Sequence, residues 1–324
     1  MSRKQGGSAC CPPARDPSPL PAQAASEQSL SNAADLSNTI YLESARFLMG
    51  SDHEEVQQGD GEGPVREVAL SGFVMDQFPV TNARFSIFVK STGYVTEAER
   101  YGWSFVFWSH IPRQRFWQLV ENTVADAPWW CKTPGAKWDS PEGPGSTIQR
   151  REDHPVVHVS WNDAQAFCAW AGKRLLTEAE WEYGARGGLV QKVYPWGDKL
   201  RQAGQHRCNI WQGEFPKHDT ADDGYAGTCP VDAFPANGFG IYSVSGNTWE
   251  WCADWWTTEH DLEAPIINPR GPVFGTNRVM RGGSFLCHKS YCNRYRVSAR
   301  TSQTPDSSTS NIGFRCATLR SVLA

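Results

Sequence analysis

The chain has 324 residues, with 31 Lys and Arg against 35 Asp and Glu, which gives a formal net charge of −4. This balance argues against a nucleic-acid-binding protein, because such a protein presents a strongly basic surface. Hydrophobic residues make up 40% of the chain, enough for a core, but no apolar run approaches the ~20 residues that a membrane-spanning helix needs.

The first segment, residues 1–38, is rich in Ser, Ala, Pro and Gln and lacks hydrophobic periodicity, which predicts a disordered tail. Residues 39–324 are even in composition, contain no linker and predict a single domain. The N-terminal residues also lack the apolar stretch of a signal peptide. We therefore expect a cytoplasmic protein in which most of the ten cysteines stay reduced.

Three helices are predicted from their capping residues. The first runs from Thr81 to about Ser91 and ends near Gly93. The second and third begin at Ser160 and Thr177, and each of these residues has an acidic residue three positions later, as in a capping box. Glycines follow both segments and predict where the helices end.

The predicted strands are short and few. They cover residues 68–76, 279–285 and 312–317, where apolar and β-branched residues are bounded by turn-forming residues. The 29 Gly and 21 Pro residues indicate many turns between these elements. We therefore expect an α+β fold with low regular secondary structure.

Two cysteines, Cys287 and Cys292, stand five residues apart after a Gly-Gly pair. Basic neighbours favour their thiolate forms. Two thiolates without a third protein ligand suit a low-coordinate soft metal such as Cu(I), but also a labile disulfide or two ordinary buried cysteines. The spacing does not match a tetrahedral zinc site, because no second Cys or His pair follows at a fixed offset. The pattern alone leaves the three interpretations open.

A second group of residues is rich in oxygen donors. Asn209 and Ile210 precede an acidic loop at residues 223–225, and a Ser- and Gly-containing segment follows at residues 243–250. Carboxylates, amides and backbone carbonyls in such loops are the ligands that Ca²⁺ takes. Turns stabilised by Asn and Asp side chains are the simpler interpretation of the pattern by itself.

Several blocks of the sequence, in the same order, resemble the formylglycine-generating enzymes, also called sulfatase-modifying factors. The resemblance runs from about residue 40 to the C-terminus. The motifs that carry it are residues 101–107, 154–164, 172–182, 209–215, 246–251, 282–296 and 304–317.

This resemblance implies a fold, an activity and partners. The fold of the family is one compact domain related to C-type lectins. Its members use O₂ and a thiol reductant to oxidise a cysteine in a Cys-x-Pro-x-Arg-type segment of unfolded sulfatases to Cα-formylglycine, which activates the sulfatase. We therefore expect a copper-dependent oxidoreductase that is monomeric and, like bacterial members, cytoplasmic.

The resemblance also assigns five residues to the active site. Cys287 and Cys292 match the two thiols that hold Cu(I), to which the substrate thiolate adds before O₂ is activated. Ser284 matches an active-site serine. Trp249 and Asn311 match positions near the substrate pocket, and a purely structural role is an equal alternative for both.

Two sets of residues match calcium sites of the family, with backbone carbonyls serving at Ile210 and Tyr225. At Ser243 the family usually has Asn, so we expect weaker binding by the second set. The first set is Asn209, Ile210, Asp223 and Tyr225, and the second is Ser243, Gly246, Thr248 and Glu250.

Cys168 and Cys316 match a structural disulfide of the secreted family members, and the resemblance leaves open whether it forms in a cytoplasmic chain. A second cysteine pair of the family falls on Ala185 and Val297, so that bridge is absent. The residues alone also allow two other functions. One is a binding module on a lectin-like scaffold, and the other is a thiol–disulfide exchanger without metal.

Overall fold

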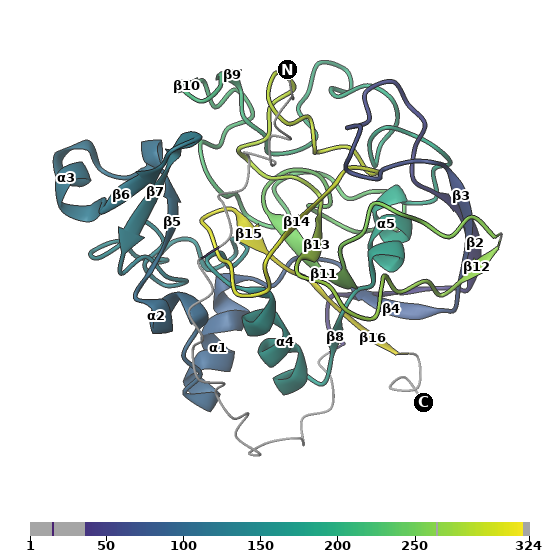
Figure 1. Cartoon of the computed structure of the whole chain (residues 1–324), viewed down its shortest axis with the longest axis horizontal. Coiled ribbons are helices and arrows are strands. Elements are labelled where there is room, and N and C mark those ends of the chain that lie inside the picture. Colours follow the sequence, from purple (N-terminus) through teal and green to yellow (C-terminus); the bar gives the residue numbers. More distant parts are fainter. Residues whose placement is uncertain (1–14, 16–35, 264, 320–324) are drawn as a thin grey trace.

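The computed structural model describes residue 15, residues 36–263 and residues 265–319. Most of the predicted tail at residues 1–38 lies outside the described residues. Within the described ranges, short strands form small sheets that a few short helices accompany (Figure 1). This confirms the predicted α+β fold with low regular secondary structure.

The central sheet of Figure 1 has the strand order β14-β13-β11-β15, and a second four-stranded sheet has the order β1-β4-β16-β8. In the central sheet β11 pairs antiparallel with β13 and parallel with β15. The strands are β11 (Trp249–Trp255), β13 (Arg278–Arg281), β14 (Arg300–Gln303) and β15 (Ile312–Gly313), then β1 (Thr39–Leu42), β4 (Phe73–Asp76), β8 (Arg174–Leu175) and β16 (Cys316–Leu319).

Three smaller sheets lie further out. Figure 1 shows the β5-β7-β6 sheet on one side of the central sheet and the β12-β3-β2 sheet on the opposite side. Their strands are β5 (Trp103–Phe107), β6 (Asn122–Val124), β7 (Ala127–Pro134), β2 (Ala45–Met49), β3 (Arg66–Leu70) and β12 (Ile266–Ile267), and a two-stranded sheet joins β9 (Gly213–Glu214) to β10 (His218–Asp219).

The helices begin where the capping residues predicted. Thr81, Ser160 and Thr177 each accept a backbone N–H from the first turn, which confirms all three predicted starts. Gly93 and Gly187 end the first and third helix in the left-handed conformation. The helices are α1 (Asn82–Thr92), α2 (Glu97–Tyr101), α3 (Phe116–Leu119), α4 (Trp161–Trp170) and α5 (Glu178–Arg186), with 3₁₀ turns η1 (Trp108–His110) and η2 (Arg113–Arg115).

The predicted strands are wrong in their extent. Residues 68–76 are divided at Gly72 into β3 and β4, which belong to different sheets. Gly72 lies so close to the hydroxyl of Tyr41 that a Cβ there has no room. Residues 312–317 likewise divide into β15 and β16, which belong to different sheets. The apolar pattern identifies both segments as extended, but it carries no information on which strand each half pairs with.

The strand predicted at residues 279–285 ends at Arg281. Gly282 and Gly283 follow with φ angles of 95° and 74°, which glycine adopts without strain and which a strand cannot contain. Ser284 therefore lies in a loop after β13 and not within a strand.

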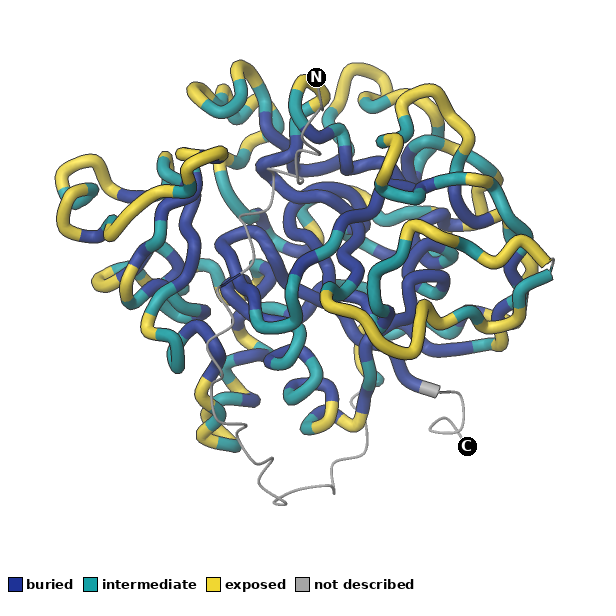
Figure 2. Tube along the Cα trace, viewed as in Figure 1, coloured by how far each residue is buried: buried dark blue, intermediate teal, exposed yellow. Residues whose placement is uncertain are grey.

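The core combines apolar clusters with buried ion pairs, and Figure 2 shows that the buried positions gather in the middle of the molecule. Arg281 is 1% exposed and pairs with Glu178 and Glu182 of α5. Arg300 of β14 pairs with Glu178 as well. Removing one partner of such a pair would leave a buried charge, so these contacts hold α5 against the central sheet. In the described part of the chain, no helix is long and apolar enough to cross a bilayer.

Candidate functional site

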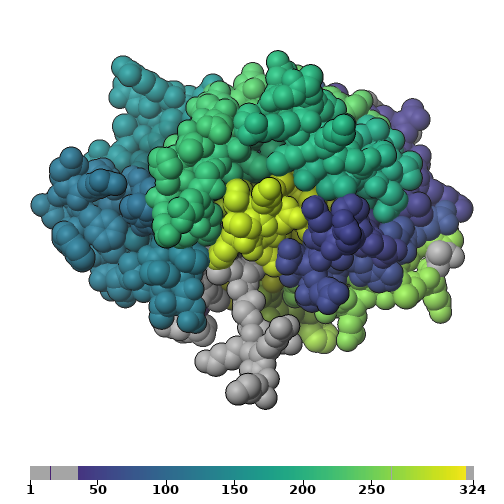
Figure 3. All heavy atoms as spheres, turned by 90° about the horizontal axis from the view of Figure 1, so that it is seen from above, coloured from purple at the N-terminus to yellow at the C-terminus, as the bar shows by residue number. Residues whose placement is uncertain are grey.

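The thiol-containing segment, residues 284–293, is a closed loop. Gly283, before the loop, lies so close to Arg294, after it, that a Cβ would meet the Arg294 carbonyl oxygen at 2.7 Å. The Arg294 side chain pairs with Asp60 (Nε–Oδ2 2.6 Å). Figure 3 shows the C-terminal part of the chain (yellow) at the surface beside the N-terminal segment that follows residue 36 (purple). The two ends of the loop are therefore fixed to each other and to a neighbouring segment.

Cys287 lies in a tight turn that begins at Ser284. The backbone N–H of Cys287 donates to the carbonyl of Ser284 (2.9 Å). In return, the backbone N–H of Ser284 is directed at the sulfur of Cys287 (N···Sγ 3.4 Å). A donor aimed at sulfur favours the thiolate, and the side chain is fully buried.

Cys292 lies in a second turn, which begins at His288. The carbonyl of His288 accepts from three successive backbone N–H groups of residues 291–293, at 3.0, 3.0 and 3.2 Å. Both cysteines belong to one buried cluster that also contains Tyr295. Burial raises the pKa of Tyr295, and the nearby ionisable groups, both thiols among them, add to this effect. The structure therefore buries both predicted thiols in the cluster that contains Tyr295, close enough to act on its charge.

The predicted serine and asparagine are in direct contact. Asn311 Nδ2 donates to Ser284 Oγ (2.9 Å). Trp249 lies one step further from the thiols, and its backbone N–H donates to the carbonyl of Asn311 (2.9 Å). The Trp249 side chain is fully buried, and among the described residues its indole N–H has no partner. Ser284 and Asn311 thus adjoin the thiol loop, and Trp249 supports Asn311 from the core.

The donor set at the loop fits a low-coordinate soft metal. In the described ranges, no group of three or more His, Cys, Asp and Glu side chains gathers where a metal ion could sit. A tetrahedral zinc site needs such a group. Two buried thiols with an N–H aimed at one sulfur instead suit Cu(I), which accepts two soft ligands.

The first set of predicted calcium ligands is gathered around Asp223. Its carboxylate accepts from the backbone N–H groups of Ile210 (3.0 Å) and Tyr225 (3.1 Å). The neighbouring Asn209 is buried, and its Oδ1 has no partner among the described residues. Burial raises the pKa of Asp223, an effect that a bound cation opposes. An orphaned amide oxygen near a carboxylate fits a Ca²⁺ site.

In the second set, an arginine side chain and not a metal ion pairs with the carboxylate. Arg315 donates to both carboxylate oxygens of Glu250, each at 2.6 Å, and to the carbonyl of Ser243 (3.3 Å). Gly246 lies nearer the first set, where it forms a β-bridge with Asn209. The Glu250 carboxylate is already neutralised, so this set as it stands does not fit a calcium ion.

The predicted disulfide partners are close but not bonded. Cys168 of α4 and Cys316 of β16 have their sulfurs 3.6 Å apart, whereas an S–S bond is about 2.05 Å long. Burial raises the pKa of Cys168, and the contact with Cys316 adds to the rise. The structure holds two neighbouring thiols, and the bond itself stays a prediction. Ala185 and Val297, where the family has its second pair, are buried apolar residues.

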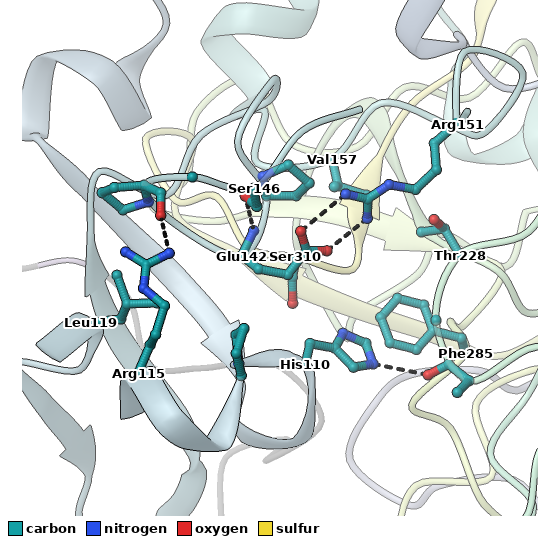
Figure 4. A pocket seen from close by; sticks show the side chains of 16 residues that line it. His110, Arg115, Leu119, Glu142, Ser146, Arg151, Val157, Thr228, Phe285 and Ser310 are labelled. Atoms are coloured by element: carbon teal, nitrogen blue, oxygen red, sulfur yellow. Dashed lines mark hydrogen bonds and ion pairs between the residues drawn. The ribbon is translucent and has the colours of Figure 1, made fainter. Parts of the chain in front are cut away.

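A cavity of about 420 Å³ adjoins the thiol loop, and no sequence motif pointed to it (Figure 4). Glu142 and Arg151 pair on its wall at 2.6 and 3.0 Å. Burial alone raises the pKa of Glu142, but Arg151 lowers it below its ordinary value. Phe285 and Ser310, next in sequence to the active-site serine and asparagine, also line the cavity. The wall residues come from distant loops, so their sequence spacing carries no signal.

Sequence reasoning also missed a pocket around Arg15. This arginine is buried between the rings of Tyr101 and Trp103. A single arginine in a segment without periodicity gives no structural signal. The one available clue is the order of the residues that end at Arg15, which is Cys-Pro-Pro-Ala-Arg at residues 11–15.

Comparison with known proteins gives a consistent family. A family model described as "Sulfatase-modifying factor enzyme 1-like domain" matches residues 24–319. A formylglycine-generating enzyme of Thermomonospora curvata is 59% identical over 281 residues, which are 86% of this chain and 92% of that protein. The Bos taurus protein of the same name is 58% identical over 271 residues, covering 84% of this chain and 72% of that protein.

Two further comparisons show how widely this similarity extends. A mouse protein named inactive C-alpha-formylglycine-generating enzyme 2 is 46% identical over 281 residues, covering 86% of this chain and 84% of that protein. The solved structure of PvdO from Pseudomonas aeruginosa has a TM-score of 0.62 and 26% identity, and covers 87% of this chain and 94% of that chain. The relatives named as formylglycine-generating enzymes are more similar to this chain than the inactive protein, at 58–59% against 46% identity, which supports an enzyme.

Proposed function

Because the chain belongs to the family of sulfatase-modifying, formylglycine-generating enzymes, we propose that it converts a cysteine in a Cys-x-Pro-x-Arg-type segment of unfolded sulfatases to Cα-formylglycine, which activates them. The reaction takes one substrate CH₂–SH group, one O₂ and two reductant thiols. It yields the aldehyde, hydrogen sulfide, one disulfide and one water. The observation that carries the proposal is that Cys287 and Cys292 are both buried, in one short loop and in the same core cluster as Tyr295.

The residues of the loop have separate tasks. Cys287 and Cys292 hold Cu(I), and the bound metal supplies the means to activate O₂ beside a substrate sulfur. The backbone N–H of Ser284 stabilises negative charge on the Cys287 sulfur, at 3.4 Å. Asn311 fixes the direction of the Ser284 hydroxyl through its 2.9 Å hydrogen bond. Burial of both sulfurs keeps water away from the donor set.

A structural calcium ion belongs to the same proposal. Asn209 and Asp223 supply side-chain oxygens, and Ile210 and Tyr225 supply backbone carbonyls. The orphaned Oδ1 of Asn209 supports this assignment. The ion would hold the segment that starts at Asn209 in place. Trp211, in this segment, donates its backbone N–H to the carbonyl of Cys287 (3.2 Å).

Mass spectrometry of a synthetic Cys-x-Pro-x-Arg peptide tests the reaction. The peptide is incubated with copper-loaded protein, air and a thiol, and we expect its cysteine to become an aldehyde. Cys287→Ser and Cys292→Ser should each abolish the conversion, whereas Cys131→Ser, at another buried cysteine, should retain it. Conversion by both of the first two variants would refute the site. Thiol exchange that continues without O₂ would favour the metal-free exchanger.

A further inference from the structure

The side chain of Thr309 binds the asparagine of the candidate site. Thr309 is fully buried, and its hydroxyl donates to Asn311 Oδ1. The backbone N–H of Asn311 donates back to Thr309 Oγ1 (3.4 Å). At the other end of the same amide, Asn311 Nδ2 donates to Ser284 Oγ (2.9 Å). The two ends of the Asn311 amide are therefore bound by the hydroxyls of two different residues.

The Thr309 hydroxyl determines which way the Asn311 amide points. An asparagine accepts through its oxygen and donates through its nitrogen, and a half-turn of the amide exchanges these two ends. Thr309 Oγ1 already accepts the backbone N–H of Asn311, so it has its own hydrogen left to donate. With the amide reversed, this hydrogen would face an NH₂ group and lose its acceptor in a buried place, which is unfavourable. Thr309 thus holds Oδ1 toward itself and Nδ2 toward Ser284.

The orientation of the amide in turn determines what the Ser284 hydroxyl can do. Ser284 Oγ accepts from Asn311 Nδ2 (2.9 Å) and from the backbone N–H of Leu286 (3.3 Å). A hydroxyl has two acceptor positions and one hydrogen, so both acceptor positions are filled. Within the described part of the chain, no acceptor receives the Ser284 hydrogen. This hydrogen is therefore available to a group that comes from outside.

A reversed amide would remove that donor. Oδ1 would then face Ser284 Oγ and accept its hydrogen. Ser284 lies beside the metal-binding loop, because its backbone N–H is 3.4 Å from the sulfur of Cys287. A hydrogen donated here to the sulfur of an incoming cysteine stabilises the thiolate form of that cysteine.

We propose that Thr309 is a positioning residue of the active site. Its hydroxyl orients the Asn311 amide so that Ser284 keeps a hydrogen for the sulfur of the substrate cysteine. The use of that hydrogen rests on the proposed function, whereas the orientation of the amide rests on the contacts of Thr309.

A purely structural role for Thr309 would depend on other atoms. Its carbonyl accepts from the backbone N–H of His158 (2.8 Å), and the residue forms a β-bridge with Phe105. Both contacts belong to the backbone, so they remain when the side chain is replaced. Valine has the shape of threonine without the hydroxyl. Thr309→Val therefore removes the donor to Asn311 and keeps the backbone contacts.

The kinetics of peptide oxidation test the proposal. Thr309→Val should lower kcat/KM about 10- to 100-fold, the usual cost of losing an outer partner at a metal site. Thr309→Ser, which keeps the hydroxyl, should restore most of the loss. Thr318→Val, at a buried threonine of β16, is the matched control and should leave kcat/KM unchanged. A wild-type kcat/KM in Thr309→Val would overturn the proposal.

A double-mutant cycle separates positioning from structure. If Thr309 acts through Ser284, Thr309→Val should cost no further activity in the Ser284→Ala background. A structural role would cost the same factor in both backgrounds, and that result would refute the proposal. Thr309→Val should also bind Cu(I) with the stoichiometry of the wild type, because both thiols are unchanged. Loss of copper would show that the substitution acts on the thiols instead.

Asn311→Asp tests the same idea with Thr309 in place. A carboxylate has two acceptor oxygens, so it accepts from both hydroxyls and takes the hydrogen of Ser284. Activity should fall as in Thr309→Val, with copper binding retained. If Asn311→Asp keeps the wild-type kcat/KM, the Ser284 hydrogen is not needed, and the proposal is wrong even if the Thr309→Val protein is unstable.

Hydrogen exchange of the Asn311 side chain needs neither copper nor substrate. In protein labelled with ¹⁵N at asparagine, the NMR signals of this NH₂ group are identified by their loss in Asn311→Asp. They should exchange with solvent faster in Thr309→Val than in the wild type, Thr309→Ser and Thr318→Val. Equal exchange in all four proteins would contradict the orientation of the amide by Thr309.

The positioning role and the proposed function fail in different ways. Faster exchange in Thr309→Val, together with a peptide that the wild type never oxidises, would refute the proposed function and support the orientation of the amide. A peptide oxidised equally well by the wild type and by Thr309→Val would refute the positioning role and support the proposed function.

Discussion

Two buried arginines, Arg315 and Arg15, are held in opposite ways. Arg315 donates to both carboxylate oxygens of Glu250 at 2.6 Å, so its charge is neutralised where it lies. Arg15 directly contacts neutral acceptors and aromatic rings, and two of its nitrogens have no partner among the described residues. The difference separates an arginine that belongs to the scaffold from one that occupies a binding pocket.

The largest expected effect comes from removing Arg315, the arginine that belongs to the scaffold. Arg315→Ala leaves the Glu250 carboxylate buried without its positive partner, so the free energy of unfolding should fall by about 3–5 kcal/mol. Urea unfolding followed by tryptophan fluorescence measures the change. Arg46→Ala, in an exposed pair with Glu67, is the control, with an expected change of no more than about 1 kcal/mol. A change that small for Arg315→Ala would contradict the scaffold role.

The addition of calcium tests the same contrast at the two predicted ligand sets. In the second set Arg315 pairs with Glu250, whereas no arginine pairs with Asp223 in the described part of the first set. Ca²⁺ at 100 times its Kd should raise the free energy of unfolding by about 2.7 kcal/mol, and EDTA should reverse the gain. Asp223→Asn should remove the response, whereas Asp222→Asn, at the exposed neighbouring residue, should keep it. A wild-type protein that is indifferent to Ca²⁺ would contradict the assignment.

A change of pH acts on the wall of the Arg15 pocket through His158. Its Nδ1 lies 2.8 Å from Ser104 Oγ, and this hydroxyl oxygen also lies 3.0 Å from the carbonyl oxygen of Ser308, which follows Ser307 on the wall of the pocket. Its Nε2 lies 2.8 Å from the carbonyl of Pro141, an acceptor, so Nε2 carries the hydrogen. Burial lowers the pKa of His158 to about 4.

The sign of the pH effect follows from this lowered pKa. The unfolded chain takes up the proton of His158 near pH 6.5 and the folded chain only near pH 4, so stability is complete above the first value. Between them it should fall by about 1.4 kcal/mol for each pH unit of acidification. Urea unfolding of the wild type and of His158→Gln at several pH values measures this contribution. An equally steep fall in the variant would assign the effect to other groups.

The local features of this molecule were predictable from the sequence. The capping boxes at Ser160 and Thr177 were found because each is closed by an acidic residue three positions away. The thiol pair was found because Cys287 and Cys292 share one short loop, and the family likeness supplied Ser284 and Asn311. In each of these cases, the residues that make the feature lie within one segment or within one recognisable motif.

The features that depend on distant contacts were not predictable. Arg315 and Glu250 are 65 positions apart, and Arg15 is separated from Ser308 by 293. Neither separation leaves a periodic pattern, because the partners meet only after the sheets have formed. The predicted strand at residues 312–317 failed for the same reason, since its two halves pair with different sheets.

The central claim of this account is that Cys287 and Cys292 form one two-thiolate metal site. Titration of the reduced protein with Cu(I) against a competing chelator tests it most directly. The account predicts one tightly bound Cu(I) per chain, lost in Cys287→Ser and in Cys292→Ser and retained in Cys131→Ser. Tight binding with unchanged stoichiometry in both of the first two variants would contradict it.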